Sequence, residues 1–168
     1  MQIPFDCYIG LGSNLYQPIQ QINAALALLK TLPETTIIKS SYLYRNPPML
    51  SVENPDPQPD YVNAAAWIKT TLTPDILLES LQKIEINSGR QRSEKKWSSR
   101  TLDLDILLYS NLQLNLPHLV IPHRGILERA FVLIPLCDCN PDLILPNGVP
   151  IKAFISAEMQ QQLTRINP

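Results

Sequence analysis

Hydrophobic and polar residues follow two different periods along this chain, and the two periods alternate. Segments 5–12, 35–45 and 61–70 are rich in β-branched and aromatic residues or alternate apolar with polar side chains, which predicts strands. Segment 18–30 instead repeats apolar side chains at helical spacing, with Ile19, Ile22, Leu26 and Leu29 on one face. Segment 73–89 predicts a second helix, which begins at a capping threonine followed by proline and ends at a glycine.

The remaining residues continue this alternation. Residues 100–109, "RTLDLDILLY", predict a buried strand, and residues 112–120 predict a further short strand. Helices are expected over 125–139 and 151–163. The order β-α-β-β-α-β, with one direct β-β step, favours an α+β sheet that contains antiparallel strands over a doubly wound parallel sheet. We therefore expect a ferredoxin-like βαββαβ core with an additional C-terminal strand and helices, in one domain that spans residues 1–168.

Two segments do not fit a helix or a strand. Residues 46–60 hold five prolines in fifteen residues and predict a long irregular loop, and such loops in compact domains are more often functional than accidental. The segment "GLGSNL", residues 10–15, predicts a tight turn whose glycines adopt positive φ. It lacks the Lys-Ser/Thr ending of a P-loop and the third glycine of a dinucleotide fingerprint, so neither standard nucleotide fold is supported.

The composition is that of an ordinary globular protein, with 168 residues, 45% of them hydrophobic and 17% charged. A net charge of −1 argues against a general nucleic-acid binder. The sequence has no apolar run long enough to span a bilayer and no evident signal peptide at its start. Of the three cysteines, Cys137 and Cys139 could in principle bind a metal together, but structural thiols in a reducing cytoplasm fit better.

Candidate chemistry concentrates around residues 90–105. Five basic residues and one acid lie between residues 90 and 100, directly before Asp103 and Asp105. Side chains at i and i+2 of a strand share a face, so the two carboxylates lie together and repel unless a proton or cation intervenes. The pair is either a solvated surface or a Mg²⁺ site completed by substrate phosphates. With the nearby arginines, His123 and Arg129, the pattern is typical of Mg²⁺-assisted transfer from a nucleotide.

Taken together, these residues resemble the 6-hydroxymethyl-7,8-dihydropterin pyrophosphokinases of folate synthesis. The resemblance runs in order through "YIGLGSNL", "SSYLYRNPP", "DYVNAA", "IEINSGRQR", "RTLDLDILLY", "IPH" and "ERAFVLIPL". It implies a ferredoxin-like fold and transfer of an intact diphosphate from ATP to the hydroxymethyl oxygen of the pterin, with release of AMP. It also implies two Mg²⁺ ions, with ATP as co-substrate.

The resemblance assigns roles to residues by their place in these motifs. Catalytic roles fall on Arg90, Arg92, Asp103 and Asp105, and both metal ions are held by Asp103 and Asp105. ATP is contacted by Gln82, Glu85, Arg92, Trp97, Arg100, Ile106, His123 and Arg129. The pterin is contacted by Asn46, Pro47, Pro48, Tyr61, Asn63, Trp97 and Phe131. Strand alternation independently places Tyr61 and Asn63 on one face. The proton acceptor stays open between Asp105 and a metal-bound water.

Three positions depart from the pattern of this family, and all lie in loops. Ser98 replaces a common glycine after the tryptophan, Asn46 replaces the usual threonine before the proline pair, and Ser93 replaces a frequent basic residue. The resemblance implies that the loop around Trp97 moves to cover the bound substrates, so we expect it to act as a lid. The departures bear on rate more than on reaction type.

Two alternatives come from other classes of protein. A nucleotidyltransferase pairs a Gly-Ser turn with an acidic D-x-D, but about ninety residues separate the two here, and its released product would be diphosphate. An RNA-binding module on the same fold would expose aromatics such as Tyr61 and Trp67, but the net charge and the two acids oppose RNA. We expect small-molecule substrates, a cytoplasmic monomer, and neither nucleic-acid nor membrane partners.

Overall fold

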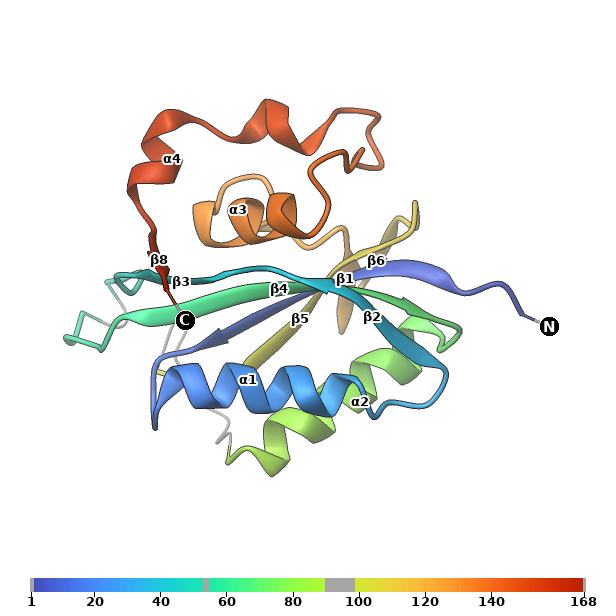
Figure 1. The fold of residues 1–168 in the computed structure, drawn as a ribbon, viewed down its shortest axis with the longest axis horizontal. Coiled ribbons are helices and arrows are strands. Elements are labelled where there is room, and N and C mark those ends of the chain that lie inside the picture. Colours follow the sequence, from blue (N-terminus) through green and yellow to red (C-terminus); the bar gives the residue numbers. More distant parts are fainter. Residues whose placement is uncertain (1, 53–54, 90–98, 168) are drawn as a thin grey trace.

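A computed structural model describes residues 2–52, 55–89 and 99–167. Its centre is a six-stranded antiparallel sheet with helices on both faces (Figure 1). The path of the sheet is β5-β1-β4-β3-β8, with β2 also paired to β4. The strands are β1 (Phe5–Ser13), β2 (Thr35–Ser40), β3 (Leu43–Asn46), β4 (Tyr61–Thr70), β5 (Asp103–Tyr109) and β8 (Thr164–Ile166). A separate hairpin is formed by β6 (Leu114–Leu116) and β7 (Leu119–Ile121).

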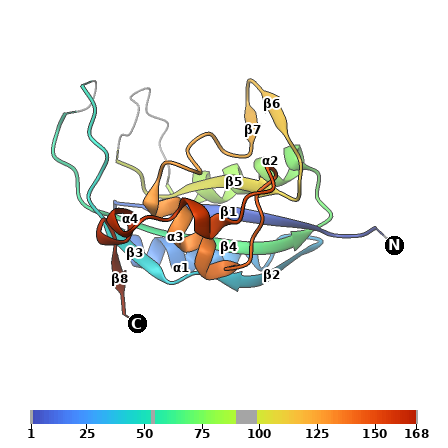
Figure 2. The same ribbon diagram turned by 90° about the horizontal axis from the view of Figure 1, so that it is seen from above.

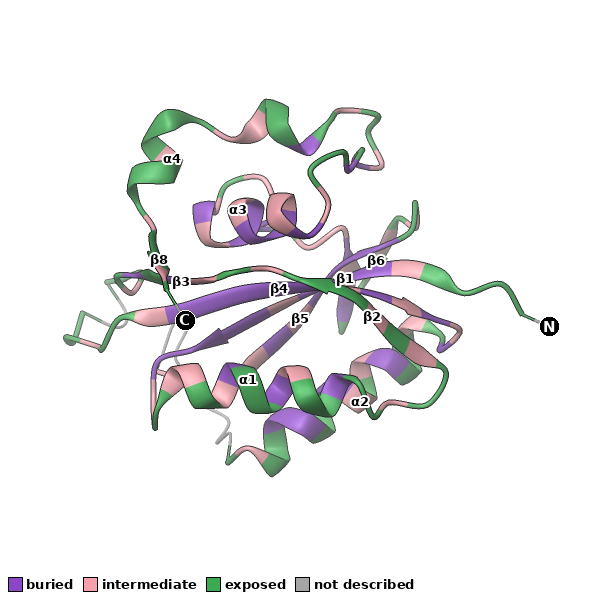
Figure 3. Cartoon of the chain, in the orientation of Figure 1, coloured by how far each residue is buried: buried purple, intermediate pink, exposed green. Residues whose placement is uncertain are grey.

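One face of the sheet is covered by two helices, α1 (Pro18–Leu29) and α2 (Pro74–Asn87) (Figure 1). Their apolar sides pack on the inward side chains of β1, β4 and β5 to form the larger core. As predicted, α2 begins at Thr73, whose hydroxyl accepts a hydrogen bond from the backbone N–H of Ile76. Figure 3 shows that β1 and β4 are buried along most of their length, while both helices expose one side. This face therefore supplies most of the apolar burial.

The opposite face is covered only in part, by α3 (Ala130–Cys139), a 3₁₀ turn (Ile151–Phe154) and α4 (Ala157–Gln161). In Figure 2, α3 lies over β4 and β3, while β5 extends beyond it. Under α3, Trp67 stacks on Tyr8 with ring centroids 5.8 Å apart, so this aromatic packs in a second core rather than forming an open platform. The part of this face beyond the N-terminal end of α3 remains accessible.

Several predicted elements have different bounds in the structure. The strand expected over 35–45 is two strands, β2 and β3, because the pairing with β4 shifts after Ile37 and the chain leaves the ladder at Ser41. The strand expected over 112–120 is the hairpin β6–β7, and the helix expected from residue 125 begins only at Ala130. Residues 151–163 divide into the 3₁₀ turn and α4, and β8 was not predicted. Within the described residues, no helix combines the length and apolar character that a membrane crossing requires.

The prediction of a positive-φ glycine turn at residues 10–15 is wrong. Gly10 and Gly12 lie inside β1, which pairs with β4 on one side and β5 on the other, and neither has a positive φ. The positive φ angles of this connection are those of Tyr16 and Gln17, at 51° and 62°. The two glycines therefore belong to the sheet and not to a turn.

Candidate active site

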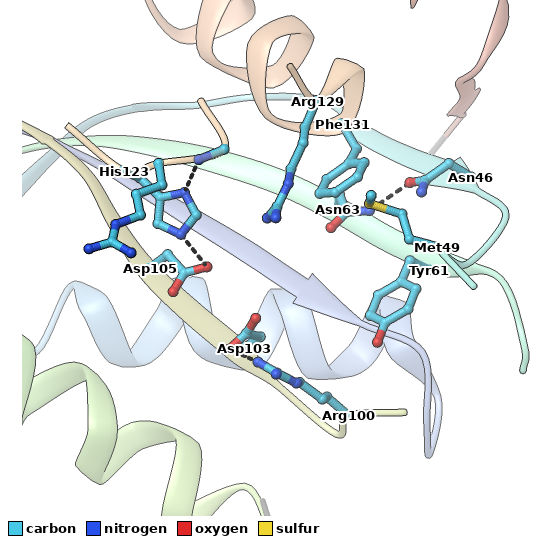
Figure 4. A pocket seen from close by; sticks show the side chains of 12 residues that line it. Asn46, Met49, Tyr61, Asn63, Arg100, Asp103, Asp105, His123, Arg129 and Phe131 are labelled. Atoms are coloured by element: carbon cyan, nitrogen blue, oxygen red, sulfur yellow. Dashed lines mark hydrogen bonds and ion pairs between the residues drawn. The ribbon is translucent and has the colours of Figure 1, made fainter. Parts of the chain in front are cut away.

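A pocket lies on the sheet face that α3 leaves uncovered, beside the N-terminal end of this helix (Figure 4). Its volume is about 380 Å³. It joins segments far apart in sequence: the end of β3 and its loop, β4, the start of β5, and the turn before α3. Its lining residues are Asn46, Met49, Tyr61, Asn63, Arg100, Asp103, Asp105, His123, Arg124, Gly125, Arg129 and Phe131.

Asp103 and Asp105 point to the same side of β5, as the two-residue period of a strand predicts (Figure 4). Arg100 Nη1 lies 2.9 Å from Asp103 Oδ1, and His123 Nε2 lies 3.8 Å from Asp105 Oδ2. The positive charge of Arg100 offsets part of the repulsion between two carboxylates that share one face. The other side of β5 packs into the larger core, so the strand is held firmly while its acids face the pocket.

The imidazole of His123 is oriented by its own turn. The backbone N–H of Gly125 donates to His123 Nδ1 at 3.1 Å. Burial lowers the pKa of His123 below its ordinary value, and the positive charge of Arg129 lowers it further. The ring is therefore neutral at pH 7, and because Nδ1 is an acceptor, its hydrogen sits on Nε2, the nitrogen nearest Asp105. This places a hydrogen-bond donor at the carboxylate end of the pocket.

Arg129 and Phe131 enter the pocket from the start of α3. The Arg129 side chain extends into the pocket between His123 and Asn63 (Figure 4). Its Cζ lies 5.9 Å from the centroid of the Phe131 ring, within the range of a cation–π contact. A guanidinium and an aromatic face thus stand side by side, the first suited to phosphate oxygens and the second to a flat ring.

The end of the pocket away from β5 holds two buried polar side chains, Asn46 and Asn63. Asn63 Nδ2 donates to Asn46 Oδ1 at 2.6 Å, and Asn46 Nδ2 donates to the carbonyl of Pro47 at 3.0 Å. This chain of amides fixes the orientation of the Asn63 side chain and turns its Oδ1 away from Asn46. Tyr61 and Met49 complete this end, and burial raises the pKa of the Tyr61 phenol, which stays neutral.

Gly10 and Gly12 form the floor between the two ends of the pocket. In the sheet register Gly12 stands opposite both Asn63 and Asp103, and a smaller hollow continues the pocket down to these glycines. A Cβ on Gly12 would lie 2.8 Å from Asn63 Oδ1, and a Cβ on Gly10 would lie 3.2 Å from the side chain of Leu107. Glycine at position 12 is therefore required by the close approach of Asn63.

Asn14 ties the start of the aspartate strand to the proline-rich loop. Its Oδ1 accepts from the backbone N–H of Arg100 at 2.8 Å, and its own N–H donates to the carbonyl of Arg100 at 3.0 Å. Its Nδ2 donates to the carbonyl of Pro59 at 3.1 Å. Asn14 is 2% exposed, so these bonds are shielded from water. No periodic signal in the sequence marks this residue.

The structure brings many of the predicted site residues to one pocket. They are Asn46, Tyr61, Asn63, Arg100, Asp103, Asp105, His123, Arg129 and Phe131. The predictions for Arg90, Arg92 and Trp97, and with them the lid, lie outside the described residues. Sequence reasoning missed Met49, Arg124 and Gly125, whose only signal is that each closely follows a predicted residue in the chain.

Five predicted residues do not line this pocket. Gln82 is exposed on α2, and Ile106 is buried in the larger core. Glu85 is buried, and its Oε1 accepts from the backbone N–H of Leu104 at 2.7 Å, so this carboxylate binds the aspartate strand. The remaining two, Pro47 and Pro48, follow Asn46 without lining the pocket themselves.

The donor set fits a magnesium ion that also binds a phosphate. Within the described ranges, no group of three or more His, Cys, Asp and Glu side chains is placed to hold a metal ion by itself. Two carboxylates on one pocket wall are nonetheless what Mg²⁺ commonly uses, since it keeps several waters and takes further oxygens from the phosphates of its substrate. Asp103 and Asp105 are the described residues suited to hold it.

Comparison with protein families gives one consistent result. Residues 8–141 match the family described as 7,8-dihydro-6-hydroxymethylpterin-pyrophosphokinase. The chain is 42% identical over 161 residues to the 2-amino-4-hydroxy-6-hydroxymethyldihydropteridine pyrophosphokinase of Haemophilus influenzae, covering 96% of this chain and 98% of the relative. It is 46% identical over 150 residues to the enzyme of the same name from Pseudomonas aeruginosa, covering 89% and 90%.

Solved structures show the same fold in larger proteins. An HPPK-DHPS crystal structure in complex with substrates superposes with a TM-score of 0.75 at 14% identity, covering 98% of this chain and 47% of that one. The wild-type HPPK-DHPS of Plasmodium falciparum with SDX-DHP gives 0.72 at 16% identity, covering 98% and 48%. The present chain thus spans just under half of these longer chains.

Proposed function

The chain belongs to the 7,8-dihydro-6-hydroxymethylpterin-pyrophosphokinase family, and we propose that the pocket beside α3 is where it carries out the reaction of that family. It is an ATP-dependent diphosphotransferase of folate biosynthesis, which transfers diphosphate to the hydroxymethyl group of 6-hydroxymethyl-7,8-dihydropterin. One observation carries the placement: Asp103 and Asp105 line the same cavity as the Phe131 ring and the Asn63 amide. A single pocket therefore offers one end for phosphates and another for a flat heterocycle.

The pterin belongs at the end formed by β3, β4 and α3. Its edge carries both donors and acceptors, and the Asn63 amide offers both, held in one orientation by Asn46. Phe131 can stack on the ring, and Tyr61 and Met49 enclose it from the other sides. The glycine floor of β1 leaves room for the hydroxymethyl group to reach toward β5.

ATP belongs at the end formed by β5 and the turn before α3. Asp103 and Asp105 would hold Mg²⁺, which supplies charge neutralisation and orientation of the phosphate oxygens when it is bound. Arg129 and the Nε2–H of His123 face the same space and suit the oxygens of the diphosphate being transferred. The pterin hydroxymethyl oxygen attacks the β-phosphorus of ATP. The bond between this phosphorus and the oxygen that bridges it to the α-phosphorus breaks, so AMP leaves, and the hydroxyl proton is released.

Several finer features are also part of the proposal. We infer that two Mg²⁺ ions bind with ATP, since two carboxylates are available and two-metal sites are common in such transfers. The strand order β5-β1-β4 followed by β2 and β3 supports a ferredoxin-like core in which the fourth sheet position is divided between two strands. Residues 1–168 would act as one monomeric domain, and three free cysteines favour a reducing cytoplasm.

The decisive experiment measures AMP formed from ATP and Mg²⁺ with and without 6-hydroxymethyl-7,8-dihydropterin. We expect pterin-dependent AMP from the wild type and its loss in Asp103→Asn, which keeps the shape of the side chain but removes its charge. Asp142→Asn is the matched control, because the Asp142 side chain is 92% exposed and does not line the pocket. Pterin-independent release of diphosphate would point to nucleotidyl transfer instead. If Asp103→Asn forms pterin-dependent AMP as fast as Asp142→Asn, the role of Asp103 is refuted.

A further inference from the structure

Gly125 sits at the centre of a turn whose backbone is pinned on three sides. The N–H of His123 donates to the carbonyl of Leu107 in β5 at 3.0 Å, and the N–H of Ile126 donates back to the carbonyl of His123 at 3.1 Å. The N–H of Gly125 itself donates to His123 Nδ1 at 3.1 Å. Gly125 and Ile126 are both buried, so this turn has little freedom to shift.

The side chain of Arg129 passes directly against Gly125, where any other residue would place its Cβ. A Cβ built on Gly125 would lie 2.5 Å from Arg129 Nε, 2.6 Å from its Cζ and 2.9 Å from its Cδ. All three distances are shorter than atoms in contact can sustain. Gly125 does not have a positive φ, so its backbone conformation does not by itself require glycine. The requirement comes from the arginine.

The arginine side chain is the part that would yield to a Cβ. The carbonyl of Arg129 accepts from the N–H groups of Val132 and Leu133 at 3.0 Å each, which fixes its backbone at the start of α3. Both backbones that meet here are thus held by hydrogen bonds, while the half-buried Arg129 side chain ends in the open pocket. Adding a methyl group to Gly125 would therefore redirect the guanidinium and leave the turn in place.

We propose that Gly125 is a positioning residue for the reaction: the absence of its side chain directs the Arg129 guanidinium into the phosphate end of the pocket, while its N–H orients His123. This inference rests on the proposed function, because it assumes that Arg129 faces the phosphates of ATP. One residue without a side chain would set the direction of two phosphate-facing groups, by leaving space for the first and by a hydrogen bond to the second.

A double-mutant cycle tests the coupling without requiring turnover. The affinity of α,β-methylene-ATP with Mg²⁺ is measured by calorimetry for the wild type, Gly125→Ala, Arg129→Ala and the double variant. We expect Gly125→Ala to weaken binding about 10- to 100-fold, the range for losing a hydrogen bond to a charged group. In the Arg129→Ala background, where the added methyl group meets no side chain, the same change should have less than about a twofold effect.

The outcomes distinguish positioning of Arg129 by Gly125 from a purely structural need for glycine. They also distinguish failure of this inference from failure of the proposed function. An equal loss in both backgrounds would overturn the inference, because glycine would then be needed by the turn itself. If Gly125→Ala does not fold, recovery of folding in the double variant supports the steric coupling, and continued misfolding overturns it. A wild type that binds the ATP analogue but yields no pterin-dependent AMP would refute the proposed function alone, since the binding cycle could still be completed.

Discussion

Replacing Glu85 tests whether its carboxylate contacts ATP, as the family resemblance implies, or instead supports strand β5. In the structure Glu85 Oε1 accepts from the backbone N–H of Leu104 at 2.7 Å, and both residues are buried. Leu104 lies between Asp103 and Asp105 on β5, the edge strand of the main path of the sheet. Its N–H therefore donates to helix α2 rather than to another strand. We expect Glu85→Ala to destabilise the protein first and to affect catalysis through β5.

The magnitude follows from the contacts that are lost. A buried N–H left without its acceptor costs about 1–3 kcal/mol. The methylene that alanine lacks adds about 0.8 kcal/mol of lost burial. The free energy of unfolding should fall by about 2–4 kcal/mol, or about 4–16 °C in melting temperature for a chain of this length. Glu85→Gln keeps an acceptor oxygen but loses the charge assistance, so its cost should be about 1 kcal/mol.

Urea unfolding and AMP-release kinetics on the same variants decide between the roles. Glu79→Ala, an exposed glutamate on the same helix, serves as the control and should change neither quantity. If Glu85 has a structural role, stability should decrease from the wild type to Glu85→Gln to Glu85→Ala. The kcat should be reduced, while the KM for ATP should change by less than about threefold. If Glu85→Ala is as stable as the wild type and has a strongly raised KM for ATP, this reasoning is refuted. Glu85 would then contact ATP, as the family resemblance implies.

Three further changes test the pocket and the buried thiols. Gly12→Ala should raise the KM for the pterin about tenfold with little change in that for ATP, because its Cβ would displace the Asn63 amide, and steady-state kinetics will show this. Arg124→Ala should raise the KM for ATP several-fold and weaken its salt dependence, since a positive charge leaves the pocket rim. Burial raises the pKa of Cys7 and Cys139 from 9.0 to about 12. Their contribution to stability is present below pH 9 and is lost as the pH rises towards 12, which urea midpoints across this range will measure.

The predictions for Gly12 and Arg124 each have a matched control. Gly10→Ala adds its methyl group against the Leu107 side chain, so it should disturb pterin binding less than Gly12→Ala does. Equal effects would show that crowding of the floor, and not Asn63, is what matters. Arg45→Ala removes an exposed arginine from β3 and should leave the ATP KM unchanged. A stability curve that stays flat up to pH 12 would contradict the burial of the two thiols.

The parts of the site that could be predicted are those set by local periodicity. Alternation along a strand put Asp103 with Asp105, and Tyr61 with Asn63, and the structure has both pairs facing the pocket. The cap at Thr73 was predicted equally well, because a helix start depends on residues within one turn. Each of these inferences needs only neighbours in the chain, which is why they could be made without tertiary information.

The parts that could not be predicted depend on partners far away in sequence. Gly12 was taken for a turn residue, whereas its reason is the approach of Asn63, fifty-one positions later on the neighbouring strand. The break between β2 and β3 depends on Ser41, whose hydroxyl accepts from the N–H of Ala65 at 2.8 Å. The clamp of Asn14 on Arg100 is equally non-local. No propensity of these residues carries information about such contacts.

The sheet divides stability and chemistry between its two faces, and this division explains how β5 tolerates two acids. On the α1–α2 side, Leu104 and Ile106 are buried in the larger core, and Glu85 satisfies the edge N–H between the aspartates. That face fixes the start of the strand, and further along Leu107 and Leu108 pack in the second core under α3. At Asp103 and Asp105 the other face is therefore free of packing demands. The carboxylates can then face a ligand, beside the beginning of α3 and on the part of the sheet that this helix does not cover. A pocket built this way should lose function before stability when its own residues are changed, whereas substitutions under α1 and α2 should do the reverse.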